Sequence, residues 1–150
     1  MIQRIQSVYL AVAVIAITVM FFFPVSSFYG NEFFFSFGLM GVSDQTLVEI
    51  KVWPLQIMAG MLIGLTLVSI FLFKNRLLQT RIIRIALLLD LAFIIMIYFG
   101  YVDVIVKKAK MSAQYEAGSY FPLIAIVFLL LAMRAVLSDE KKVRSADRLR

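Results

Sequence analysis

Residues 53–73 read WPLQIMAGMLIGLTLVSIFLF, a run of 21 residues without a charged side chain. At about 1.5 Å of rise per residue, a helix of this length reaches roughly 31 Å, which matches the hydrocarbon core of a bilayer. Apolar and polar residues do not alternate inside the run, so it is not a strand of an outer-membrane barrel. We therefore expect residues 53–73 to form a transmembrane helix.

Three further apolar stretches, residues 5–23, 82–102 and 120–138, are also long enough to span a bilayer. The 150-residue chain is 63% apolar and 16% charged, whereas soluble domains average about 45–50% and 25%. A soluble fold of this size cannot bury so much apolar surface. The sequence predicts an all-α integral membrane protein, with residues 1–150 forming one domain of four transmembrane helices.

The chain contains no Cys and no His. This excludes disulfides, thiolate or imidazole metal sites, and Cys–His or Ser–His nucleophile pairs. Every Lys lies outside the four spans or at their ends, and no glycine-rich phosphate loop is present. Asp90 and Asp103 would stand about 20 Å apart along one helix, too far to share a proton. We expect a protein that is not an enzyme and has no catalytic residue, cofactor or metal.

The distribution of Lys and Arg predicts the orientation. Eleven of the 15 lie at the start of the chain, between the second and third spans, or at the end of the chain. The other four are Lys51, Lys107, Lys108 and Lys110. Because basic residues favour the cytoplasmic side, both termini are expected in the cytoplasm, with residues 138–150 as a cytoplasmic tail. The net charge of +6 is then a topology signal, and no nucleic-acid partner is predicted.

Residues 24–52 form the longest segment outside the spans and are expected to be an extracytoplasmic loop that contains β-structure. Phe33–Met40 is apolar and aromatic, and Leu47–Val52 alternates between apolar and charged residues. A β-hairpin from these two segments would cap the outer end of the bundle. Val102–Val106, in the second outer loop, is expected to add a strand.

The two ends of the chain carry a family resemblance. The start MIQRIQSVYL (residues 1–10) and the tail DEKKVRSADRLR (residues 139–150) resemble a Bacteroidota family of small membrane proteins designated domain of unknown function 4293. The similarity in length, four-helix layout and both termini covers the whole chain. It implies a multi-pass protein of the bacterial inner membrane and no particular activity.

Asp90 is the sharpest functional candidate, because it falls near the middle of the third span. An acid at that depth costs about 2.5–3.5 kcal/mol on insertion scales, and the folded protein must accommodate it. Thr66, Ser69 and Arg134 are the candidate partners. Asp90 either belongs to a proton or ion pathway or fixes helix register through a buried hydrogen bond or ion pair.

Gly60 and Gly64 form a GxxxG pattern, which lets a neighbouring helix backbone approach closely. The pattern predicts helix packing, either inside the bundle or at a dimer face.

Two surfaces are candidates for contact with a partner. The outer loop is rich in phenylalanine, including Phe33, Phe35 and Phe37. The tail carries Arg144 and Arg148 on a stretch that would extend the fourth helix. The alternatives are packing of the cap onto the bundle for the aromatic residues, and a positive-inside anchor for the tail.

These features favour a small accessory or scaffold subunit of a larger inner-membrane assembly, with the lipid bilayer and a larger membrane protein or a homo-oligomer as partners. The alternative is an oligomeric proton or ion pathway that uses Asp90.

Overall fold

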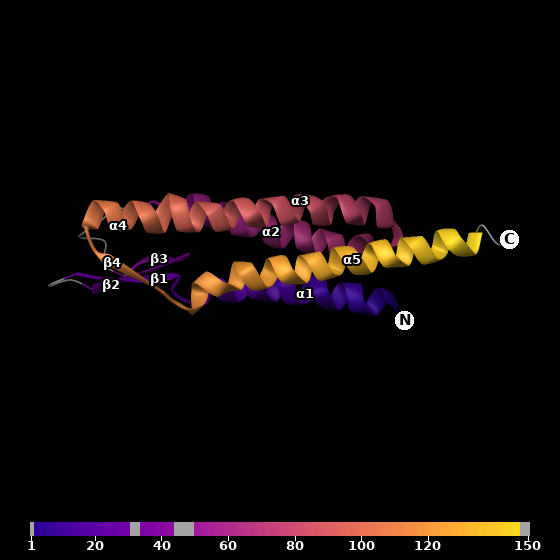
Figure 1. Cartoon of the computed structure of the whole chain (residues 1–150), viewed down its shortest axis with the longest axis horizontal. Helices are drawn as coiled ribbons and strands as arrows, with labels where there is room; N and C mark the ends of the chain where they lie inside the picture. The colour runs from indigo at the N-terminus through magenta and orange to yellow at the C-terminus, as the bar shows by residue number, and fades with distance from the viewer. Residues whose placement is uncertain (1, 31–33, 44–49, 148–150) are drawn as a thin grey trace.

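Four helices long and apolar enough to cross a membrane run side by side along the molecule (Figure 1). This computed structural model describes residues 2–30, 34–43 and 50–147. The helices are α1 (Ile2–Val19), α2 (Trp53–Phe71), α3 (Arg76–Ile95) with its continuation α4 (Asp103–Ala109), and α5 (Phe121–Asp147). Short 3-10 turns extend α1 over Met20–Phe22 and α2 over Leu72–Lys74, and another, Ala117–Tyr120, precedes α5. The start of α1 and the end of α5 lie at the same end of the bundle (Figure 1).

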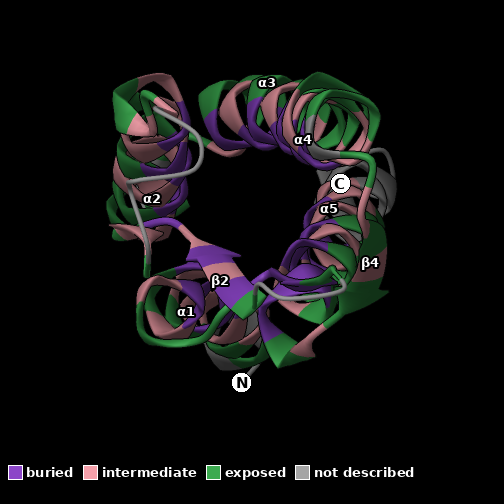
Figure 2. Cartoon of the chain, turned by 90° about the vertical axis from the view of Figure 1, so that its left-hand side faces the viewer, coloured by how far each residue is buried: buried purple, intermediate pink, exposed green. Residues whose placement is uncertain are grey.

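The helices form a ring in which α1 packs against α2 and α5, and α3 packs against α2 and α5 (Figure 2). Small residues let α1 and α5 approach closely, since Ala13 and Ala16 on α1 and Ala125 and Ala132 on α5 are all buried. Every helix also exposes large apolar side chains on its outer side. In water such a surface would be unstable, whereas lipid chains cover it without cost, so the structure fits a bilayer environment.

The third span is longer than predicted. α3 and α4 are joined by a π-helix, Met96–Val102, so that helix continues from Arg76 to Ala109 instead of residues 82–102. The expected strand at Val102–Val106 is therefore wrong. Ile97, Val102 and Ile105 are buried on this helix, and their spacing shows that helical burial overrides the preference of β-branched residues for strands. α5 likewise extends beyond the predicted residues 120–138.

A four-stranded antiparallel sheet covers one end of the bundle, in the order β3-β2-β1-β4. Its strands are β1 (Ser26–Tyr29), β2 (Phe34–Gly38), β3 (Gly41–Val42) and β4 (Ser112–Tyr115). The predicted strand at residues 33–40 is thus confirmed as β2. Its neighbours are β1 and β3, whereas most of the expected partner at residues 47–52 lies outside the described residues and residues 50–52 are not in a strand. β4 comes from the segment between α4 and α5, so the sheet unites this segment with the one between α1 and α2.

Aromatic and polar contacts attach this sheet to the helices. Phe37 stacks on Tyr101, with ring centroids 5.7 Å apart. The Tyr101 hydroxyl donates to the Lys51 carbonyl at 2.9 Å, and the Tyr98 hydroxyl donates to the Ser119 carbonyl at 2.9 Å. The Gln56 side-chain amide, on α2, donates to the Leu39 carbonyl at 2.8 Å. The sheet is therefore held by α2 and by the π-helix together.

Gly118 sits at the point where the two outer loops meet. Its backbone N–H donates to the Pro24 carbonyl at 2.9 Å. A Cβ on Gly118 would lie 2.8 Å from the Phe23 carbonyl oxygen and closer still to that of Pro24. Only glycine permits this approach of two backbones.

Candidate functional site

Asp90 lies on the inner face of α3. Ile83, Ala86, Phe93 and Ile97 recur around it at helical spacing, and all are buried. Asp90 itself is 0% exposed. Neither carboxyl oxygen has a hydrogen-bond partner among the described residues. The structure therefore holds an acid in an apolar interior without an evident partner, which is energetically costly and frequently associated with function in membrane proteins.

Thr66 and Ser69 also point into the bundle, because they share the buried face of α2 with Leu55, Ala59 and Leu62. They do not lie at the depth of Asp90. The Ser69 carbonyl accepts a hydrogen bond from the side chain of Gln79 at 3.1 Å. Gln79 precedes Asp90 by eleven residues on α3, which places Ser69 about 16 Å from the level of Asp90 by helix rise. The Thr66 hydroxyl donates to the Leu62 carbonyl at 2.7 Å.

The structure does not bring Arg134 to Asp90. The buried residues of α5 include Ala125, Leu129, Ala132, Val136 and Asp139. Arg134 stands two positions from both Ala132 and Val136, so it falls on the opposite side of the helix, where it is exposed beside Val127, Leu130 and Leu131. The expectation that Arg134 reaches inward to the acid is corrected by this geometry.

A second buried polar cluster occupies the end of the bundle that holds both termini. The Gln6 side-chain amide donates to the Asp139 carboxylate, and an Arg76 guanidinium N–H donates to the Asp139 backbone carbonyl at 3.1 Å. Gln6 is 4% and Asp139 6% exposed. Sequence reasoning missed this cluster by assigning Asp139 to the tail. The spacing of Ala132, Val136 and Asp139, three or four residues apart, could have indicated that Asp139 shares the buried face of the fourth helix.

Several buried polar atoms of these two regions are unsatisfied. They are Ser69 Oγ, Gln79 Oε1, both carboxyl oxygens of Asp90 and Asp139 Oδ1, none of which has a partner within the part of the chain described. Ser69, Gln79 and Asp139 gather toward the end that holds the termini, whereas Asp90 lies deeper and apart. Chemically, Asp90 is able to take up and release a proton or to attract a cation.

Gly60 and Gly64 are not used for packing inside the bundle. A Cβ on either residue would meet no atom within 4 Å in the part of the chain that the structure describes. Ile57, Met61, Val68 and Phe71, on the same side of α2, are exposed. Of the two alternatives, packing inside the bundle therefore does not describe these glycines, and α2 presents them to its surroundings.

The outer aromatic residues divide into two groups. Phe35 and Phe37 are buried, and Phe35 stacks on Phe28 with ring centroids 5.0 Å apart. These two side chains pack the cap, because they are almost fully buried, whereas Phe34, on the same strand, is 59% exposed. Phe33 lies outside the described residues, as does Arg148. Arg144 falls on α5, whose helix extends through most of the predicted tail.

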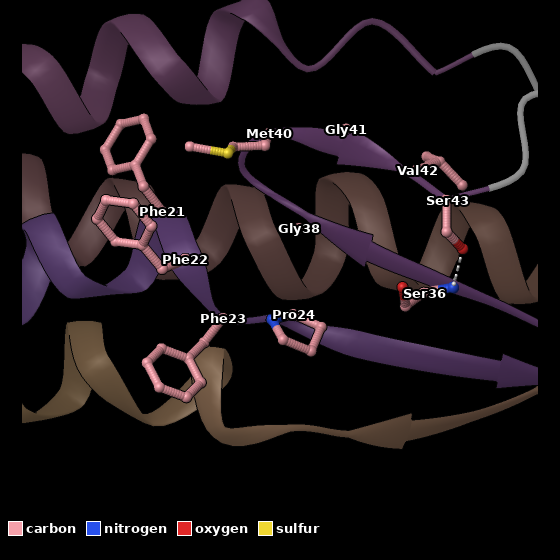
Figure 3. Close-up of a pocket in the computed structure, with 10 residues that line it drawn as sticks. All are labelled: Phe21, Phe22, Phe23, Pro24, Ser36, Gly38, Met40, Gly41, Val42 and Ser43. Atoms are coloured by element: carbon pink, nitrogen blue, oxygen red, sulfur yellow. Dashed lines mark hydrogen bonds between the residues drawn. The ribbon is translucent and has the colours of Figure 1, made fainter.

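An open recess lies where the end of α1 meets β2 and β3 (Figure 3). It measures about 400 Å³ and is lined by Phe21, Phe22, Phe23, Pro24, Ser36, Gly38, Met40, Gly41, Val42 and Ser43. Phe22 is 73% and Met40 68% exposed. Exposed aromatic side chains of the cap therefore include Phe22, before β1, and Phe34, within β2.

Comparison with known proteins identifies the family. Residues 2–149 match the sequence profile of the family described as domain of unknown function (DUF4293). The chain belongs to this DUF4293 family. No curated protein matches the chain in sequence. The family description names no activity, so it does not assign a role to Asp90. Within the described residues, no three acidic side chains gather to hold a metal ion.

Proposed function

We propose that the chain is a non-enzymatic accessory or scaffold subunit that docks against a larger protein of the bacterial inner membrane, with both termini in the cytoplasm. The observation that carries this proposal is the open face of α2, where a Cβ on Gly60 or Gly64 would meet no atom of the described residues within 4 Å. In a bilayer, helices associate through close packing, and glycines four residues apart create the notch that admits a second helix.

The surroundings of the two glycines fit a docking groove. Four large residues, Ile57, Met61, Val68 and Phe71, project from the same face of α2 and are 45% to 75% exposed. Large side chains flanking a glycine notch supply the van der Waals contact that drives helix association in lipid. The partner is therefore expected to present an apolar transmembrane helix.

The test is purification from native membranes in mild detergent, with an affinity tag at the C-terminus and direct measurement of mass and stoichiometry. Wild type should retain a larger membrane protein in fixed ratio. Gly60→Leu combined with Gly64→Leu should lose it while still purifying as a folded monomer, because both added side chains enter open space. Ala92→Leu, on an exposed position of α3, is the matched control and should retain the partner.

The outcome separates the function classes. A wild-type protein recovered only as a monomer would contradict the accessory role. A homogeneous homo-oligomer disrupted by the glycine variants would instead place copies of this chain against each other on α2.

The second candidate function is a proton or ion pathway in an oligomer, favoured by the unpartnered and fully buried carboxyl group of Asp90. Reconstitution into vesicles with a pH-sensitive or ion-sensitive dye tests it. Loss of flux in Asp90→Asn with unchanged folding would support the pathway. Absence of flux in the wild-type protein would exclude it.

A further inference from the structure

A shallow groove between α3 and α5 opens at the end of the bundle that holds both termini. Its volume is about 110 Å³, and it is lined by Leu77, Thr80, Arg81 and Arg84 from α3 and by Leu137 and Glu140 from α5. Arg81 and Arg84 are exposed. They stand three residues apart, so their side chains leave the same face of α3. The groove therefore presents two guanidinium groups beside apolar walls.

A third arginine lies at the same level on the neighbouring helix. The hydrogen bond from Arg76 to the Asp139 carbonyl sets α3 and α5 side by side at that point. Arg81 lies five residues inward from Arg76, and Arg134 lies five residues inward from Asp139, which is about 7.5 Å along each antiparallel helix. Arg134 also precedes Leu137 by three residues, so it lies beside Leu137 on α5, next to the groove and outside its lining.

The charges of these three arginines are not neutralised within the described part of the chain, where none of them forms a hydrogen bond or ion pair. Arg76 differs, because its guanidinium already binds the α5 backbone. Glu140 also lines the groove, so the three arginines face one carboxylate. The groove therefore keeps an excess of positive charge.

The surface next to Arg134 is apolar. Val127, Leu130 and Leu131 line a recess of about 190 Å³ with Arg134 at its edge. A site with guanidinium groups above an apolar recess on a membrane helix matches a phosphate group attached to an acyl chain.

We propose that this groove binds an anionic phospholipid, with its phosphate held by Arg81, Arg84 and Arg134 and one acyl chain lying along Val127, Leu130 and Leu131. Arginine suits this task because its planar fork donates two hydrogen bonds to one phosphate. A bound lipid would also bridge α3 and α5, and so stabilise the bundle.

Native mass spectrometry tests the site on the full-length protein in mild detergent, titrated with phosphatidylglycerol or, for comparison, phosphatidylcholine. Wild type should bind phosphatidylglycerol in preference and show an increase in melting temperature on binding. Arg81→Gln combined with Arg84→Gln should weaken phosphatidylglycerol binding by roughly tenfold to thirtyfold. Arg81→Lys combined with Arg84→Lys should fall between the two, since lysine keeps the charge and loses the paired hydrogen bonds.

The matched control is Lys108→Gln combined with Lys110→Gln, which removes two exposed charges at the opposite end of the bundle. It should bind phosphatidylglycerol as wild type does. Arg134→Gln gives an independent test from α5, and should weaken binding severalfold even if the double variant on α3 fails to fold. Equal affinity for the two lipids, or a loss in the control as large as in the arginine variants, would overturn the proposal.

Discussion

The side-chain amide of Gln6, near the start of α1, donates a hydrogen bond to the carboxylate of Asp139, near the end of α5. The two residues are 133 positions apart in the chain, and both are buried. This bond, together with the contact of Arg76 on the Asp139 backbone, joins three helices at one end of the bundle. At the other end, the sheet joins the two outer loops.

Gln6→Leu is expected to destabilise the protein by about 1–3 kcal/mol, because it leaves a buried carboxylate without its donor. Unfolding in mixed detergent and denaturant, followed by circular dichroism, measures the change. Gln6→Leu combined with Asp139→Leu should recover most of the loss, since no polar group is then left unsatisfied. If the double variant is less stable than Gln6→Leu alone, the loss of the Gln6–Asp139 hydrogen bond does not explain the destabilisation by Gln6→Leu.

Gly118→Ala is expected to lower stability by about 1–3 kcal/mol, because its methyl group collides with the backbone of Phe23 and Pro24. Gly60→Ala and Gly64→Ala are the matched controls on the open face of α2. They should leave the melting temperature unchanged or raise it, since alanine favours helix by up to about 1 kcal/mol over glycine. If alanine at Gly60 or Gly64 lowered the stability as much as alanine at Gly118, the two glycines would not lie on an open face of α2.

Membrane orientation is testable because the chain has no cysteine. Single substitutions Lys108→Cys and Ser138→Cys place thiols at exposed positions at opposite ends of the bundle. In cells with an intact inner membrane, an impermeant maleimide should label Lys108→Cys and spare Ser138→Cys until the membrane is broken. The reverse labelling pattern would invert the predicted topology.

The helices were predictable from the sequence because long apolar runs leave a chain in a bilayer few alternatives. The side of each helix that faces the interior of the bundle was harder to predict. Lipid and protein interior are equally apolar, so hydrophobicity did not reveal that Gly60 and Gly64 face outward. Polar residues indicated the inward face better than apolar residues did, as the burial of Asp90 shows. β4 was not predictable, since Ser112–Tyr115 has an exposed polar pattern and gains its strand conformation by pairing with β1.

Asp90→Leu distinguishes a structural from a functional acid. If Asp90 fixed helix register, its removal would break a hydrogen bond or ion pair and lower stability. Since neither carboxyl oxygen has a partner among the described residues, the substitution should remove an unfavourable buried group and raise the melting temperature.

The control for this substitution is Gln79→Leu at another buried polar position of α3. Its side chain donates to the Ser69 carbonyl, so the loss of that bond should lower the melting temperature. A decrease at Asp90 equal to that at Gln79 would establish a structural partner for the acid. An increase at Asp90 would mean that the chain retains the carboxyl group at the expense of stability, which is the behaviour expected of a residue kept for function.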